Sequence, residues 1–104
     1  MMAATILCLV AEVPNGTTIV CKDSMPIRIA GLETGELVPK KARAVLARLA
    51  IGQKVSCLPA GNEGPFIVAK CTLPDGRDLA CTLIKSKAAV QSPAAWRRYG
   101  LKDC

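Results

Sequence analysis

The chain has 104 residues, six cysteines, three aromatic residues and no histidine, and its formal net charge is +6. A composition that is 51% apolar and 21% charged is typical of one globular domain, and it excludes a disordered or collagen-like chain. The absence of histidine excludes Ser-His and Cys-His nucleophiles and any zinc site that needs imidazole. Chemistry would have to use carboxylates, arginines or thiols.

The N-terminal third predicts a three-stranded meander. Asn15-Gly16 lies between two apolar runs that are rich in β-branched residues, and this dipeptide is a strong hairpin signal. A second turn follows, and Pro26 fits the first position of the third strand. The predicted strands span residues 6–13, 18–21 and 26–32, and we expect residues 33–38 to form a loop.

The segment after this loop predicts an amphipathic helix over residues 39–51. Pro39 suits its first turn, and Gly52 suits the position just after its end. The apolar positions follow the helical spacing i, i+3, i+4 and i+7, as Ala42, Val45, Leu46 and Leu49. The opposite face is basic and contains no acid, with Lys40, Lys41, Arg43 and Arg48.

The second half of the chain predicts two more strands and two short helices. The strands are expected at residues 54–58 and 66–72, with a loop rich in Gly and Pro over 59–65. Asp78 is a suitable N-cap for a helix whose Leu79 and Leu83 point inward. Ser92-Pro93 is a helix start, and Gly100 is its stop.

Five short strands with one helix between the third and the fourth are the element order of an OB-fold barrel. The expected fold class is therefore mainly β with helices, with the short helices at the C-terminal end. We expect a single domain over residues 1–104, with the barrel at about 6–73 and a C-terminal helical segment at about 78–104. Barrels of this kind include nucleic-acid binders, sugar binders and enzymes, so the fold does not identify the function.

The cysteines are even in number and form no CxxC pair, which favours disulfides over a zinc site. Such a framework indicates a secreted or periplasmic protein, whereas buried free thiols in a cytoplasmic protein are the alternative. The longest apolar run, residues 1–11, is too short for a membrane span and lacks the features of a signal peptide. Six cysteines allow 15 pairings, so the connectivity stays open at this point. The candidate pairs are Cys57 with Cys71 on neighbouring strands, Cys81 with Cys104, and Cys8 with Cys21 if the register allows.

Charge is distributed unevenly along the chain. Residues 1–39 contain two basic and four acidic residues, a net charge of −2, whereas residues 40–104 contain twelve basic and four acidic residues, a net charge of +8. Such an excess favours a polyanion such as single-stranded nucleic acid, and the alternative is a solvated basic face. Besides the basic helix face, Arg97 and Arg98 are candidate nucleic-acid-binding residues because they lie between Trp96 and Tyr99, whose rings can stack on bases. The alternative, which a small barrel poor in large side chains favours, is that these two aromatics pack the tail onto the barrel and leave the arginines solvated.

Several stretches follow one another as they do in a known family. Asn-Gly-Thr-Thr-Ile at 15–19 and Ile-Arg-Ile-Ala-Gly-Leu-Glu-Thr-Gly-Glu at 27–36 precede the helix, and Gly-Pro-Phe-Ile-Val-Ala at 64–69 and Asp75-Gly76 follow it. This order resembles the staphylococcal nuclease (thermonuclease-like) family over about residues 6–90. That family reads D-G-D-T-[IV], then R-[IL]-x-G-[IL]-D-[AT]-P-E, then Y-G-R-x-[LV]-A, then a D-G turn before a short helix. The second stretch is the most specific.

The resemblance implies calcium-dependent cleavage of phosphodiester bonds in DNA and RNA. In that chemistry a cation held by oxygen ligands polarises the phosphate, a glutamate activates water and two arginines stabilise the developing charge. Arg28 matches the first arginine, and Glu36 matches the water-activating glutamate. Thr34 matches the threonine whose backbone carbonyl helps bind calcium. Glu33 stands where the second metal-binding aspartate of the family is expected.

The departures from the family pattern fall on this chemistry. Thr17 replaces a metal-binding aspartate, Gly35 replaces the loop proline, and Gly64 and Phe66 stand where the tyrosine and the second arginine are expected. Losing one preorganised charge typically lowers a rate about 10²- to 10³-fold. Arg77 is a candidate to replace the second arginine, although in the family this turn lies at the far end of the fifth strand from the active site.

These departures predict a barrel that has lost most nuclease activity and has a binding or accessory role toward nucleic acid or protein, with no cofactor. One alternative is a weak metal-dependent nuclease that uses calcium. Another is a disulfide-stabilised structural module.

Overall fold

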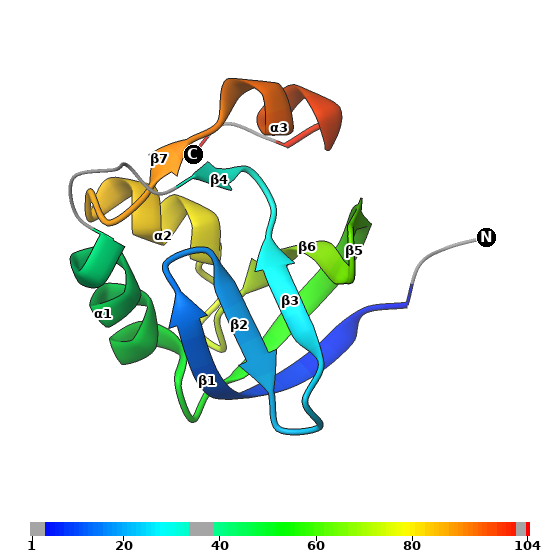
Figure 1. Cartoon of the computed structure of the whole chain (residues 1–104), viewed down its shortest axis with the longest axis vertical. Coiled ribbons are helices and arrows are strands. Elements are labelled where there is room, and N and C mark those ends of the chain that lie inside the picture. The colour runs from blue at the N-terminus through cyan, green and yellow to red at the C-terminus, as the bar shows by residue number, and fades with distance from the viewer. Residues whose placement is uncertain (1–3, 34–38, 102–103) are drawn as a thin grey trace.

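Five strands close into a mixed β-barrel in the computed structural model, which describes residues 4–33, 39–101 and 104 (Figure 1). Around the barrel, neighbours run in the order β1 (Ile6–Asn15), β2 (Thr18–Cys21), β3 (Pro26–Ile29), β6 (Phe66–Thr72) and β5 (Lys54–Glu63). The β3–β6 pair is parallel and the other pairs are antiparallel. This closed, OB-like barrel confirms the predicted fold class.

The length of β1 explains how the sheet closes. Its first half pairs with β5 and its second half pairs with β2, and two register shifts bend it between Val10 and Asn15. Alternate residues of each strand point inward because successive side chains leave opposite faces of a strand. The described core contains no aromatic side chain, and its barrel positions include Cys8, Val10, Ile19, Cys21, Ile27, Ile29, Val55, Cys57, Ala69 and Cys71.

The third strand is shorter than the sequence predicts. It ends at Ile29, and Gly31 then adopts a φ of +88°, a left-handed conformation that favours glycine and turns the chain out of the barrel. The following residues form β4 (Leu32–Glu33), which pairs with β7 (Val90–Gln91). The two-residue strand β7 was not predicted, because so short a segment has no readable period.

The loop predicted over residues 59–65 is wrong for most of its length, because β5 continues to Glu63. The continuation is possible since β1 pairs with β5 only over Lys54 to Cys57, so Pro59 faces no partner on that side. A register shift between Pro59 and Gly61 bends the strand there, and proline is tolerated at such edges and bulges. The strand thereby carries Glu63 to the far end of the barrel.

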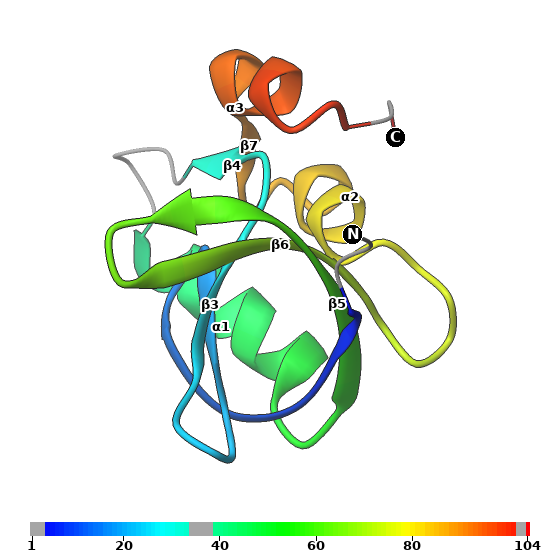
Figure 2. The same cartoon turned by 90° about the vertical axis from the view of Figure 1, so that its right-hand side faces the viewer.

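The helices begin where the sequence predicts, and α1 and α3 end just before their predicted stop glycines, Gly52 and Gly100. In α1 (Pro39–Ala50), Leu46 and Ala42 are buried, and Figure 2 shows the helix crossing one end of the barrel. Asp78 caps α2 (Leu79–Lys85) by accepting a 2.9 Å hydrogen bond from the Cys81 amide. Ser92 caps α3 (Pro93–Arg98) in the same way through the Ala95 amide, at 3.3 Å.

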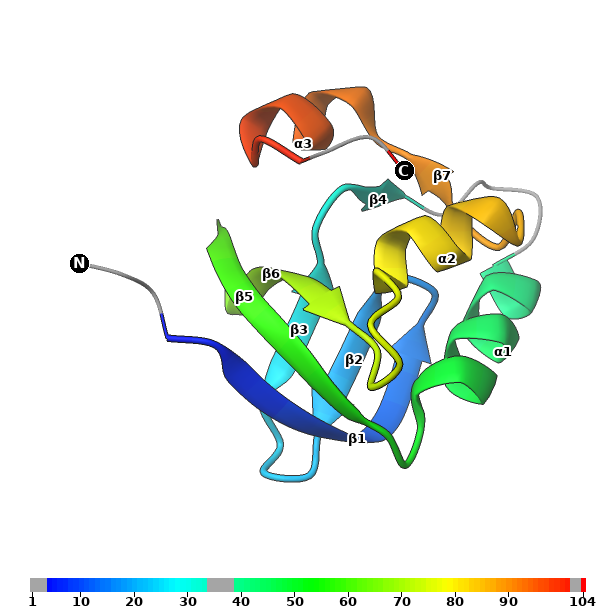
Figure 3. The ribbon, with the colours of Figure 1, turned by 180° about the vertical axis from the view of Figure 1, so that it is seen from behind.

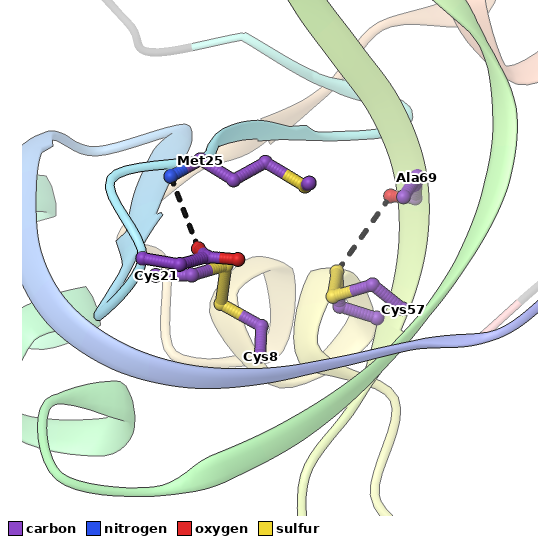
Figure 4. The surroundings of a disulfide bond; sticks show 7 residues. Cys8, Cys21, Met25, Cys57 and Ala69 are labelled. Carbon is purple, nitrogen blue, oxygen red and sulfur yellow. Dashed lines mark hydrogen bonds between the residues drawn. A yellow bond between two sulfur atoms is a disulfide. The ribbon is translucent and has the colours of Figure 1, made fainter.

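All six cysteines form disulfides, and the three pairs are the candidate pairs named from the sequence. Cys57 and Cys71 lie directly opposite each other on β5 and β6, with their Cα atoms 4.0 Å apart. The register of β1 against β2, which the sequence leaves open, pairs Cys21 with Val10. Cys8 lies two residues before Val10 in β1, so its side chain is on the same inward face as that of Val10. Figure 4 shows these two disulfides inside the barrel.

Three disulfides in so short a chain fit an oxidising, extracellular type of environment. Among the described residues, no helix is long and apolar enough to cross a membrane.

Candidate functional site

A polar pocket of about 340 Å³ lies where β3 leaves the barrel. The turn after β1, the end of β3, the segment through β4, the tip of β5 and the start of α3 all contribute to it. Figure 1 shows these elements near one end of the molecule, below α3. The lining residues are Thr17, Arg28, Ile29, Gly31, Leu32, Glu33, Glu63, Ser92 and Ala95.

Arg28 reaches this pocket because of the alternation along β3. Ile27 and Ile29 are buried in the core, so the residue between them points outward. The Nη1 atom of Arg28 lies 3.6 Å from Oε1 of Glu63, and its guanidinium carbon lies 4.8 Å from the centroid of the Phe66 ring. The two charged side chains are 35% and 37% exposed, so solvent screens the pair and its contribution to stability is small.

Glu63 is in turn bound by the C-terminal segment. The Tyr99 hydroxyl donates a 3.0 Å hydrogen bond to Oε2 of Glu63, while Arg28 engages Oε1. The result is a connected chain from Phe66 through Arg28 and Glu63 to Tyr99. Sequence analysis missed Glu63, since it lay in the predicted loop, and no local pattern indicates that strand β5 extends to it.

The structure brings together two of the four residues matched to catalysis and metal binding. Glu33, in β4, lines the same pocket as Arg28. Thr34 and Glu36 lie outside the described residues. Thr17, at the position of the replaced aspartate, also lines the pocket, and its hydroxyl donates a 3.1 Å hydrogen bond to Oδ1 of Asn15.

The described part of this pocket does not provide the set of oxygen ligands that calcium requires. Calcium takes six to eight oxygen ligands, of which carboxylates are the strongest. The pocket has two described carboxylates, and that of Glu63 already accepts contacts from Arg28 and Tyr99. Across residues 4–33, 39–101 and 104, no group of three Asp, Glu, Cys or His side chains is placed to hold a metal ion.

The predicted nucleic-acid-binding residues lie outside the pocket lining, in two groups. All are exposed, four on α1 and two on α3: Lys40, Lys41, Arg43, Arg48, Arg97 and Arg98. The burial of Ala42, Leu46 and Ala50 explains the first group, because it leaves the opposite helix face to solvent. Figure 3 shows α1 and α3 at separate places on the molecule.

Arg77 does not belong to the pocket. Its Nε lies 2.6 Å from Oδ2 of Asp75 in the turn between β6 and α2. The hydrogen bond donated by the backbone N–H of Arg77, together with that from its guanidinium, lowers the pKa of Asp75 below the usual range of a carboxyl group. Arg77 is therefore engaged at a turn and does not line the pocket beside Arg28.

Comparison with models of known protein families finds none that matches this chain, and comparison with curated proteins finds no match.

Proposed function

We propose that this chain is a barrel of the staphylococcal nuclease type that has lost phosphodiester cleavage and binds single-stranded nucleic acid. The observation that carries the loss of cleavage is the engagement of Arg28 by Glu63. Stabilising a phosphorane-like transition state needs positive charge aimed at the phosphate oxygens before the reaction begins. Here the guanidinium faces a carboxylate, and Arg28 is the one arginine among the described residues that line the pocket.

The binding part of the proposal depends on the basic residues outside the pocket. A carboxylate-lined pocket repels phosphate, whereas the exposed face of α1 contains Lys40, Lys41, Arg43 and Arg48. No acidic residue occurs in the first turn of that helix. Such a face can neutralise several phosphates and release their counterions, which is the main source of affinity for nucleic acid without sequence preference.

The loss of cleavage can be tested by incubating single-stranded DNA and RNA with the purified protein in calcium and in chelator. We expect the same background hydrolysis in both, because neither the arginine nor the described carboxylates are arranged for the reaction. The Glu36→Gln variant controls for contaminating nuclease. Calcium-dependent cleavage that disappears in Glu36→Gln would contradict the proposal and support the weak nuclease instead.

Binding can be tested by the salt dependence of affinity for a single-stranded oligonucleotide. We expect log K to fall linearly with log salt concentration, with a slope of about −0.7 for each phosphate neutralised. Lys40→Gln with Lys41→Gln should make the slope shallower by about 0.7 for each phosphate that these lysines neutralise in the wild type. The matched control, Lys22→Gln with Lys54→Gln, removes the same charge from exposed residues on other elements and should leave the slope unchanged.

Two results would count against binding through α1. Undetectable binding at low salt would favour the structural module, and an equally shallow slope in the two double variants would mean that only net charge matters.

A further inference from the structure

The C-terminal strap, which we define as residues 92–101 together with Cys104, forms one wall of the pocket. Its first backbone contact is the 2.8 Å hydrogen bond that the Ser92 amide donates to the Gly31 carbonyl. Ser92 and Ala95 line the pocket directly. Figures 1 and 3 show α3 of the strap lying beyond β4, outside the barrel. The pocket is therefore complete only while the strap is in place.

Three side chains of the strap, Trp96, Tyr99 and Leu101, hold it by contacts that are not covalent. Trp96 is 8% exposed and packs on Gly31, where an added Cβ atom would come within 2.6 Å of its ring. Its indole Nε1 is nevertheless buried with no hydrogen-bond partner among the described residues, which weakens this contact. Tyr99 lies against Gly61 and donates its hydroxyl to Glu63. Neither aromatic belongs to the hydrophobic core of the barrel.

The covalent anchor of the strap is the disulfide between Cys104 and Cys81 of α2. It differs from the other two disulfides in accessibility. The four barrel cysteines are at most 5% exposed, whereas Cys104 is exposed and Cys81 is half-buried. Thiol–disulfide exchange requires a thiolate to reach a sulfur atom, so in the folded protein the strap disulfide is the accessible one.

We propose that the Cys81–Cys104 disulfide is a redox switch that keeps the strap closed over the pocket. A thiolate of a dithiol reductant attacks Sγ of Cys104 and forms a mixed disulfide, and Cys81 leaves as a thiolate that takes up a proton. The second thiol of the reductant then displaces Cys104, which also becomes a thiol. The protein gains two electrons and two protons, and the reductant becomes a disulfide.

Opening follows because the reduced strap has no covalent anchor and keeps only the Ser92–Gly31 hydrogen bond and the contacts of Trp96, Tyr99 and Leu101. When it leaves, the pocket loses Ser92 and Ala95 from its wall, and Glu63 loses the hydrogen bond from Tyr99. The barrel stays closed, since its own two disulfides and its core lie elsewhere. The switch goes beyond the proposed function and does not depend on nucleic-acid binding.

Trp96 makes the switch directly measurable because it is the only tryptophan in the chain. In the Cys81→Ser, Cys104→Ser variant we expect its emission to shift to longer wavelength and acrylamide quenching to rise about twofold or more, as a buried indole becomes exposed. Far-UV circular dichroism should remain that of the wild type. Wild-type protein treated with a dithiol should show the same change, reversed by reoxidation.

The order in which the three disulfides are reduced gives a second readout. It tests the proposal even if the double variant fails to fold. After brief treatment with dithiol, alkylation and peptide mapping should find Cys81 and Cys104 modified while the four barrel cysteines stay paired. Unchanged Trp96 emission and quenching after cleavage of the strap disulfide would overturn the proposal. Equal rates of alkylation at Cys57 or Cys71 would overturn it as well.

Discussion

Replacing both Cys57 and Cys71 by alanine is expected to lower the free energy of unfolding by about 3 kcal/mol, the value for opening a loop of about 15 residues. The two residues are 14 apart in sequence and are almost completely buried between β5 and β6. Their removal frees the unfolded chain and also takes sulfur atoms out of a core that has no aromatic side chain. Urea unfolding followed by far-UV circular dichroism measures the loss.

The matched control is the Cys81→Ala, Cys104→Ala variant, which also removes one disulfide. Its closed loop is longer, with a sequence separation of 23, but it ends in the strap rather than in the barrel. We therefore expect the barrel of this control to unfold at nearly the wild-type urea concentration. Equal losses in the two variants would show that loop length alone, and not the position in the barrel, determines the stabilisation.

Leu46→Ala is the second substitution with a large expected effect. The side chain is fully buried at the centre of α1, between this helix and the barrel that it covers. Truncating a buried leucine removes transfer free energy and leaves a cavity, which together lower stability by about 3 to 5 kcal/mol. In a barrel of this size the loss is a large fraction of the total stability.

Leu58→Ala provides the comparison for this experiment, since it makes the same chemical change on a side chain that is 48% exposed. We expect its effect on the free energy of unfolding to stay within about 0.5 kcal/mol. Thermal and urea unfolding of both variants measure the difference. Similar losses at the two positions would mean that α1 does not close the core as the structure describes.

Much of the fold could be predicted because its determinants are local. Asn15-Gly16 placed the hairpin, Asp78 and Ser92 placed two helix starts, and the spacing of the apolar residues set the buried face of α1. The errors have local causes too. Proline and glycine after Cys57 led to the prediction of a loop. They occur instead in β5, because a strand with one free edge tolerates both residues.

The candidate site was only partly predictable for a different reason. Arg28 and Glu33 were named from the resemblance of residues 27–36 to a family motif, and both line the pocket. The group that engages Arg28 could not be named. Glu63 and Tyr99 are 36 residues apart, and neither lies near Arg28 in sequence.

The sequence by itself therefore determined the order of elements, the caps and the inward faces, because these depend on spacing along the chain and on turn chemistry. Only the tertiary structure decided what surrounds Arg28. The parallel pairing of β3 with β6 brings Phe66 beside it, the bend in β5 carries Glu63 to it, and the packing of the strap places Tyr99 within reach of Glu63. These contacts follow from barrel closure and strand register, which are properties of the whole sheet and not of any one segment.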